Sequence, residues 1–398
     1  MQRTDVAIIG AGTAGTLAAA ILGRAGYATA LIDPATRFGP DFRCEKLEDA
    51  HVGALQKAGF LADVLPAARR YDTIWIARQG YLVEKRPRTE YGIDYPALVN
   101  TMRNMLAGTV SVIGDKVVGV EPDARETLLR LGDGGSLTAR LVVVATGLNA
   151  GLLGTLGMER RMVSRCHSIS IGFDVAPLAR ERFPFDALTY FGEHPDHKVA
   201  YFTLFPIGAG TRANLFVYRE KGDPWFAELR ADPAAALHAC MPRLRKITGD
   251  FEVRGNLRVR PTDLVDTANY EKPGLVLIGD AFSTACPVSG TGASKALVDA
   301  ERLCDVYAPK WLAGPDIPYS RIAEFYRDDE KVASDQHSRA LSVFARQLAL
   351  EPGLTWTAYR WLRYAASLGR DAVAGLQGRP HGVPDGREDG QAGSKRRA

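Results

Sequence analysis

The sequence predicts an α/β fold that combines a Rossmann-like domain, an interleaved domain with an antiparallel sheet, and C-terminal helices. The chain begins with a strand, a glycine turn, a helix and a second strand, "DVAIIGAGTAGTLAAAILGRAGYATALID", which is a βαβ unit. A second strand–loop–helix segment, "LVLIGDAFSTACPVSGTGASKALVDAERL", covers residues 275–303. Between the two, aromatic strands such as "KVAYFTLFPIG" are typical of a mostly antiparallel sheet with one buried face.

The length of the chain predicts more than one domain. At 398 residues it is longer than one hydrophobic core usually supports. The expected boundaries are 1–70, 94–160 and 263–318 for a discontinuous nucleotide-binding domain, 71–93 and 161–262 for the sheet domain, 319–372 for a helical region, and 373–398 for a tail. The tail has too few apolar residues to offset the entropy of ordering, so we expect it to be disordered.

Composition and charge indicate a soluble globular protein with no nucleic-acid partner. Hydrophobic residues make up 46% of the chain, and no run reaches the roughly twenty apolar residues that a membrane span needs. About half of the net charge of +4 belongs to the stretch from Arg379 to the end, so no basic patch is indicated on a folded domain. The five cysteines form no CxxC pair and no metal-ligand spacing, which favours reduced thiols, a cytoplasmic location and no metal.

The first turn carries the pattern GxGxxG, formed by Gly10, Gly12 and Gly15, with Ala14 in the same turn. Because the turn follows a strand and opens a helix, these glycines suit a tight bend, the close approach of a pyrophosphate, and close packing of strand on helix. Asp33 lies eighteen residues past Gly15, at the end of the second strand. A carboxylate there accepts hydrogen bonds from an adenosine ribose and repels a 2′-phosphate. The pattern therefore predicts a site for FAD or NAD in preference to NADP.

The second strand–loop–helix segment distinguishes FAD from NAD. Asp280 lies at a strand end, where it suits a ribityl hydroxyl, and Gly290 and Gly292 open the following helix. The positive end of that helix would face the part of an isoalloxazine ring where negative charge collects on reduction. This arrangement favours a reduced, anionic flavin.

The residues of this segment resemble the GD motif of the para-hydroxybenzoate hydroxylase-like flavin monooxygenases. The match covers roughly residues 1–160 and 263–305 and implies an FAD-binding domain of the Rossmann-like, glutathione-reductase type. The residues that carry the resemblance are Gly279, Asp280, Pro287, Gly290, Gly292 and Asp299.

The resemblance also identifies further candidate cofactor contacts and two departures from the family pattern. Arg43 falls where the family places an arginine near the cofactor phosphates, and Val117 is a further candidate contact. Thr146, followed by Gly147, stands where the family has an Asp-Gly pair that serves both flavin and pyridine nucleotide, and Tyr95 stands where relatives often have arginine. A threonine cannot supply the anion, so the two intact motifs support FAD, whereas NAD(P)H is expected from the resemblance alone.

The implied activity is that of a single-component monooxygenase. In this family NAD(P)H reduces the flavin, oxygen adds at the flavin C4a carbon, and the hydroperoxide transfers an oxygen atom to an electron-rich substrate. We expect an aromatic or other apolar small molecule beneath the antiparallel sheet, facing the flavin across the loop at Pro287. The candidate lining residues are Tyr190, Tyr201, Phe202 and Phe205, although alternation along a strand prevents Tyr201 and Phe202 from both pointing inward.

The expected fold is also compatible with two other functions. One is a flavin-dependent reductase of isoprenoid double bonds, similar to geranylgeranyl reductases. The other is non-redox binding of a prenylated partner, as in proteins similar to the GDP dissociation inhibitors, although the intact Asp280 and glycine pair speaks against it. A flavin halogenase is disfavoured because the WxWxIP signature is absent. The aromatic and basic stretch 356–370 leaves peripheral membrane association open, and the sequence does not define the oligomeric state.

Overall fold

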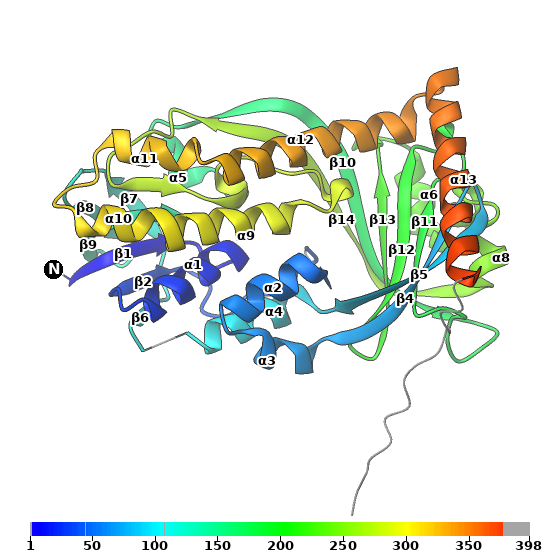
Figure 1. The fold of residues 1–398 in the computed structure, drawn as a ribbon, viewed down its shortest axis with the longest axis horizontal. Helices are drawn as coiled ribbons and strands as arrows, with labels where there is room; N and C mark the ends of the chain where they lie inside the picture. Colours follow the sequence, from blue (N-terminus) through cyan, green and yellow to red (C-terminus); the bar gives the residue numbers. More distant parts are fainter. Residues whose placement is uncertain (1, 44, 107, 377–398) are drawn as a thin grey trace, which may run out of the picture.

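Two β-sheets lie side by side in the computed structural model, which describes residues 2–43, 45–106 and 108–376. Helices cover the first sheet, and the long helix α12, Asp329–Leu350, extends from the helices over the first sheet to the second sheet (Figure 1). The predicted α/β class, with a second sheet and C-terminal helices, is confirmed. Most of the predicted tail, from residue 377 onward, lies outside the described residues.

The first sheet has a parallel centre with an antiparallel extension. β1, Gln2–Ile9, pairs in parallel with β2, Thr29–Ile32, and with β9, Ser136–Val144. Because helices cover this centre, its strands are apolar and buried on both faces. In order across the sheet, the remaining strands are β6 (Val110–Ile113) beside β2, then β8 (Thr127–Leu131) and β7 (Val117–Glu121) beyond β9, with β15 (Leu275–Leu277) also paired to β9.

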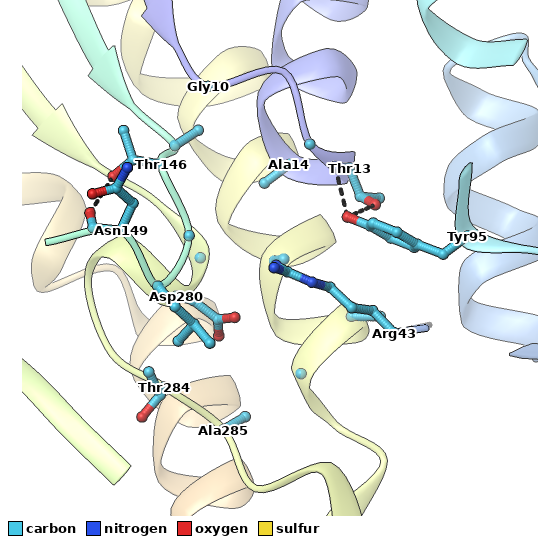
Figure 2. A pocket seen from close by; sticks show the side chains of 18 of the residues that line it. Gly10, Thr13, Ala14, Arg43, Tyr95, Thr146, Asn149, Asp280, Thr284 and Ala285 are labelled. Carbon is cyan, nitrogen blue, oxygen red and sulfur yellow. Dashed lines mark hydrogen bonds between the residues drawn. The ribbon is translucent and has the colours of Figure 1, made fainter. Parts of the chain in front are cut away.

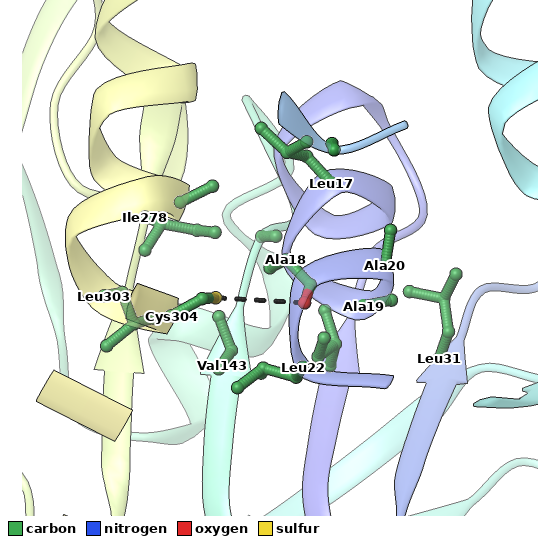
Figure 3. Close-up of a cluster of buried hydrophobic side chains, with 14 of the residues drawn as sticks. Leu17, Ala18, Ala19, Ala20, Leu22, Leu31, Val143, Ile278, Leu303 and Cys304 are labelled. Carbon is green, nitrogen blue, oxygen red and sulfur yellow. Dashed lines mark hydrogen bonds between the residues drawn. The ribbon is translucent and has the colours of Figure 1, made fainter. Parts of the chain in front are cut away.

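Helix α1, Thr13–Arg24, packs closely because its buried face consists largely of alanine and leucine. Leu17, Ala18 and Leu22 meet Val143 of β9 and Cys304, which follows helix α9 (Gly292–Arg302) (Figure 3). The Cys304 thiol lies 3.8 Å from the Ala18 carbonyl oxygen. These contacts join the two strand–turn–helix segments that are far apart in the sequence.

The second sheet is built on the aromatic strands that the sequence predicts. Its hairpin at Gly208 joins β12 to β13 in antiparallel register, so the glycines there form a turn between two strands. In order across the sheet, the strands are β14 (Phe251–Ala268), β10 (Glu159–Pro177), β13 (Gly210–Val217), β12 (Val199–Ile207), β11 (Ala187–Phe191), β4 (Arg69–Arg78), β5 (Tyr81–Gly92) and β3 (Lys46–Leu47).

The segment between β2 and β4 contains a short strand as well as helices. Lys46 and Leu47 pair with Gly92 and Tyr91, because this stretch runs along the edge of the second sheet before α2 begins. Between β3 and β14 the helices and helical turns are α2 (Asp49–Lys57), α3 (Leu61–Val64), η1 (Leu65–Ala67), α4 (Tyr95–Asn104), α5 (Gly151–Thr155), η2 (Pro195–His197), α6 (Trp225–Ala231), α7 (Pro233–Cys240) and α8 (Leu244–Thr248).

The C-terminal helices pack on both sheets. Asp328 caps the N-terminus of α12, because its side chain accepts a hydrogen bond from the Lys331 backbone amide at 3.0 Å. The helix contacts α9 and β12. The remaining elements are η3 (Gly279–Ala281), η4 (Pro287–Ser289), η5 (Leu303–Tyr307), α10 (Ala308–Ala313), α11 (Tyr319–Tyr326) and α13 (Leu354–Leu376). Within the described part of the chain, no helix has the length and apolar character required to cross a membrane.

Candidate active site

A cavity of about 880 Å³ opens between the two sheets, within the range of small-molecule and cofactor sites. Its walls come from the glycine turn before α1, the loop after β2, the loop after β9, the 279–296 segment and the second sheet. In Figure 2 the side chains of Arg43 and Asp280 extend into the same space from opposite sides.

The three glycines of the first turn have different structural roles. Gly10 has φ +101°, and a Cβ atom there would lie 2.5 Å from the Ala145 carbonyl oxygen. A Cβ on Gly15 would lie 1.9 Å from the Gly10 carbonyl oxygen, so Gly15 is required by packing and does not line the cavity. A Cβ on Gly12 would meet only the Tyr95 hydroxyl, at 3.6 Å. Gly12 is therefore the glycine at which a side chain would project into the cavity.

We expect Gly12→Ala to weaken FAD binding without destabilising the cofactor-free protein. The added methyl group finds space in the protein but occupies the path of a pyrophosphate, so the dissociation constant for FAD should rise about tenfold or more. Gly10→Ala is the matched comparison, because its strained backbone and clash should lower the free energy of unfolding by about 1–3 kcal/mol. Fluorescence titration with FAD and urea unfolding of the apoprotein separate the two effects. Unchanged FAD affinity in Gly12→Ala would remove Gly12 from the cofactor site.

Asp33 is held at one end of the cavity by the backbone around it. Its Oδ2 accepts a hydrogen bond from the Ala11 amide at 2.8 Å, and its Oδ1 accepts one from the Ala35 amide at 2.9 Å. Arg103, a buried residue that sequence reasoning missed, donates to the carbonyl oxygens of Ala11 and Ala35 and lies 3.6 Å from the Asp33 carboxylate. Burial lowers the pKa of Arg103, and the charge of Asp33 opposes this shift. The carboxylate therefore keeps a fixed direction toward the cavity.

Asp280 lines the other end of the cavity, among cations. Its removal from water raises the pKa of the carboxyl group, whereas Lys295, Arg43 and Arg160 lower it. Arg160 also donates to the Asp280 carbonyl oxygen at 2.8 Å. The preceding amide, Gly279 N–H, donates to Asp299 at 2.7 Å. The turn that carries Asp280 is thus fixed from both sides.

The loop after Asp280 leaves the beginning of α9 open to the cavity. Gly290 has φ +70° and follows the turn η4, and apart from its chain neighbours no atom of the described residues lies within 4 Å of a Cβ built there. Gly292, the first residue of α9, would meet only the Ala285 side chain, at 3.5 Å. The unpaired backbone N–H groups of a helix N-terminus suit a negatively charged or electron-rich ligand group.

The two positions that depart from the family pattern also line the cavity. The Tyr95 hydroxyl accepts hydrogen bonds from the Thr13 side chain at 3.1 Å and the Thr13 amide at 3.4 Å (Figure 2). Thr146 lies in the loop next to Gly10, and its hydroxyl donates to the Asn149 carbonyl oxygen at 3.1 Å. Arg43 lies with its guanidinium carbon 6.0 Å from the centre of the Tyr95 ring.

Most of the residues singled out in the sequence come together around this one cavity. The lining includes Gly10, Gly12, Ala14, Asp33, Arg43, Val117, Tyr201, Gly279, Asp280, Pro287, Gly290 and Gly292.

Three of the aromatic candidates for the substrate wall lie elsewhere. Tyr190 and Phe202 are fully buried in the core on the opposite face of the second sheet, and the Tyr190 hydroxyl donates to Glu193 at 2.5 Å. Phe205 is buried in a separate cluster with Tyr71. Alternation along β12 explains the difference between Tyr201 and Phe202, whereas the position of Phe205 depends on the strands that cover that end of the sheet.

A polar group on the sheet side of the cavity has no clear sequence signal. Glu45 lies directly before β3, and its carboxylate is buried in an ion pair with Arg212 of β13. Arg212 also pairs with Asp174 at 2.7 Å. Burial raises the pKa of Glu45 to about 7, although the charge of Arg212 lowers it. Three buried polar atoms in this wall have no hydrogen-bond partner among the described residues: Glu45 Oε2, Ser170 Oγ and Asn214 Oδ1.

Comparisons with known proteins agree with this geometry. Residues 3–309 match the family described as FAD binding domain. The chain is 28% identical over 383 residues to the menaquinone reductase of Mycolicibacterium smegmatis, covering 87% of this chain and 84% of that protein. It is 23% identical over 332 residues to the 6-hydroxynicotinate 3-monooxygenase of Bordetella bronchiseptica, covering 77% and 83%. The solved structure of p-nitrophenol 4-monooxygenase PnpA from Pseudomonas putida DLL-E4 gives a TM-score of 0.75 at 17% identity, covering 95% of this chain and 98% of that one.

The fold and the family match define an FAD-dependent oxidoreductase. The chain belongs to the FAD binding domain family, within the para-hydroxybenzoate hydroxylase-like superfamily of flavin-dependent enzymes, and FAD is its cofactor.

Proposed function

We propose that this protein is a single-component monooxygenase that uses NAD(P)H and FAD to hydroxylate an aromatic or other apolar small molecule. The observation that carries the proposal is that one cavity extends from Asp33 to Tyr201 and Phe216 of the second sheet. A dinucleotide bound along the first sheet would therefore share its cavity with the substrate. A cytoplasmic location, where NAD(P)H is available, is part of this proposal.

Groups at both ends of the cavity would hold FAD. Asp33 would accept hydrogen bonds from the adenosine ribose, and Gly12 would let the pyrophosphate approach the N-terminus of α1, with Arg43 neutralising its charge. Asp280 would accept a hydrogen bond from the ribityl chain, and the open N-terminus of α9 would face the flavin ring. When bound and reduced, FAD supplies the activation of dioxygen and the transfer of one oxygen atom.

The sheet side of the cavity supports an aromatic substrate that carries a hydrogen-bond donor. Tyr201 and Phe216 form an aromatic wall, with ring centroids 4.7 Å apart. Buried polar atoms without partners cost free energy until a ligand satisfies them. Glu45 Oε2 and the Asn214 carbonyl are acceptors, and the Ser170 hydroxyl can donate or accept. A phenol or an aromatic amine offers the donors that these atoms lack.

Glu45 would orient the substrate and accept a proton from its hydroxyl group. The geometry that supports this role is an unpartnered oxygen in the cavity wall on a carboxylate fixed by Arg212. Asn214 lies close enough to lower the pKa of Glu45, but burial has the larger effect and raises it to about 7. A base with a pKa near the working pH is well matched to proton transfer. Loss of the proton would make a phenolic substrate more electron-rich.

A reductase is the second candidate, because the relative that is 28% identical over most of both chains is named a menaquinone reductase. The reductase would hydrogenate an isoprenoid double bond without consuming oxygen. The same cavity would serve a monooxygenase and a reductase, so the two functions must be distinguished by their products and by oxygen consumption.

Anaerobic reduction followed by addition of oxygen tests the proposal. The FAD-loaded protein is mixed with NADH and, separately, with NADPH, and then with air-saturated buffer containing a panel of phenols and anilines. We expect one nicotinamide to bleach the visible flavin absorbance, and one oxygen molecule to be consumed for each hydroxylated product. If neither nicotinamide bleaches the flavin, the single-component proposal fails. Hydrogenation of an isoprenoid double bond in the side chain of a polyprenyl quinone, with no oxygen uptake, would replace it with the reductase.

A further inference from the structure

A second cavity, of about 220 Å³, lies behind the aromatic wall of the first. Tyr201 lines both cavities, and its hydroxyl donates at 2.9 Å to the carbonyl oxygen of Val288, which lines the second cavity. Tyr201, held by this hydrogen bond, is therefore part of the wall between the second cavity and the candidate active site.

The walls of the second cavity are largely apolar. Helix α12 contributes Leu341, Phe344 and Leu348, and the second sheet contributes Phe191 as well as Tyr201. Such a lining suits an aliphatic chain or an aromatic ring. The volume suits a short chain, since it lies below that of common drug-sized sites.

Three arginines line the same cavity: Arg78 of β4, and Arg360 and Arg363 of α13. The guanidinium carbon of Arg78 lies 3.9 Å from the centre of the Phe191 ring, and its Nε donates to the Ser367 hydroxyl at 3.3 Å. Burial, and next the charge of Arg363, lower the pKa of Arg78 to about 10. Arg360 donates to the Leu348 and Glu351 carbonyl oxygens.

Among the described residues that line the second cavity, none forms an ion pair with Arg78 or Arg363. Arg363 has no hydrogen bond or ion pair with any residue that the structure describes. The acid that lines the cavity, Glu193, already accepts hydrogen bonds from the Tyr190 hydroxyl and the Arg243 amide through Oε1. Nearby Glu84 is paired with Arg370 and Arg86. Two neighbouring cations beside apolar walls are unfavourable until an anion lies between them.

We propose that this second cavity binds an apolar carboxylate, with its chain against α12 and its acid group at Arg78 and Arg363. The planar guanidinium groups can each donate two hydrogen bonds to a carboxylate. The site itself does not depend on the proposed oxygenation. The carboxylate has two sources that share this chemistry: the acidic arm of a long substrate that passes Tyr201, or a separate ligand.

Calorimetric titration of the FAD-loaded full chain with octanoate tests the site. We expect octanoate to bind, and octanol to bind at least about tenfold more weakly because it lacks the charge. Arg363→Ala should weaken octanoate binding by about tenfold or more while leaving octanol binding unchanged. Arg254→Ala is the matched control, since this exposed arginine pairs with Glu252 on the distant edge strand β14. No octanoate binding, or equal affinity for octanol, would overturn the proposal.

A blocking variant locates the bound octanoate. Ala345 of α12 lines the second cavity and not the first, so Ala345→Phe should abolish octanoate binding and leave the visible flavin spectrum of the ligand-free protein unchanged. Unaltered octanoate binding in this variant would place the ligand elsewhere and refute the site.

Flavin absorbance distinguishes the two sources of the carboxylate. A chain that passes Tyr201 would enter the flavin cavity and change the visible spectrum, whereas a chain confined to the second cavity would not. A spectral change with hexadecanoate and none with octanoate assigns the cavity to one arm of the substrate. No change with either chain, with both bound, assigns it to a separate ligand.

Discussion

Asp299→Ala is expected to lower the free energy of unfolding by about 3–5 kcal/mol, because it removes the fully buried carboxylate that pairs with two buried lysines. Asp299 is fully buried in α9. Its Oδ1 accepts a hydrogen bond from Lys331 at 3.0 Å, and its Oδ2 lies 3.4 Å from the Lys295 ammonium group. Burial would raise the pKa of Asp299, but the two lysines lower it overall. Asp335, which contacts both lysines, would remain, but it is less buried than Asp299.

The same substitution is expected to weaken FAD binding. Asp299 also accepts the hydrogen bond from the Gly279 amide, at 2.7 Å, and Gly279 begins the turn that carries Asp280. Without this bond a buried N–H group is unsatisfied, and the turn loses the contact that holds it against α9. The protein should therefore be purified with substoichiometric FAD, which its visible absorbance measures.

An exposed ion pair provides the control for Asp299. Asp305→Ala removes the 2.6 Å contact with Lys57, whose side chain is 59% exposed, and such a surface pair contributes at most about 1 kcal/mol. Urea unfolding of both apoproteins compares the two substitutions. A loss of less than about 1 kcal/mol in Asp299→Ala, with full FAD content, would contradict a structural role for the buried network.

The cofactor side of the site could be anticipated because its signals are local. In the first segment a strand, a glycine turn and a helix follow one another, and this order alone brings Gly12 and Asp33 to one edge of a parallel sheet. Gly279 and Asp280 belong to a second local pattern of the same kind. The residues of both patterns line one cavity, which requires only that the two strands pair with their neighbours in the expected parallel order.

The substrate side could not be anticipated because its contacts join distant parts of the chain. Glu45 and Arg212 are separated by 167 residues, and neither belongs to a pattern that marks a buried pair. Tyr190 and Phe205 satisfy the aromatic alternation of their strands, yet both are enclosed by protein. Which face of a strand meets a cavity depends on the register of its partners and on the helices that cover it, and the local sequence fixes neither.

Glu45→Gln is expected to lower kcat/KM by about 100-fold at pH 8 for a phenol that supports oxygen uptake. The amide keeps the size of the side chain but cannot accept a proton. In the wild-type protein the active form would be the carboxylate, so kcat/KM should rise with pH through about 7, the raised pKa of Glu45. This rise should be absent from the variant. The measurement is the pH profile of kcat/KM for both proteins.

Stability provides a second measurement for Glu45 that needs no substrate. A carboxyl group whose pKa is raised by folding binds its proton more tightly in the folded state, so it stabilises the protein fully below the unfolded value of 4.5 and loses this effect as pH rises through about 7. The free energy of unfolding should therefore fall between pH 5 and pH 8 more steeply in the wild type than in Glu45→Gln. Glu252→Gln, an exposed residue of β14, should behave as the wild type does. If the free energy of unfolding changes with pH in the same way in the wild type and in Glu45→Gln, Glu45 is already ionised between pH 5 and pH 8.

A pH profile of kcat/KM that the substitution leaves unchanged would exclude Glu45 as the proton acceptor.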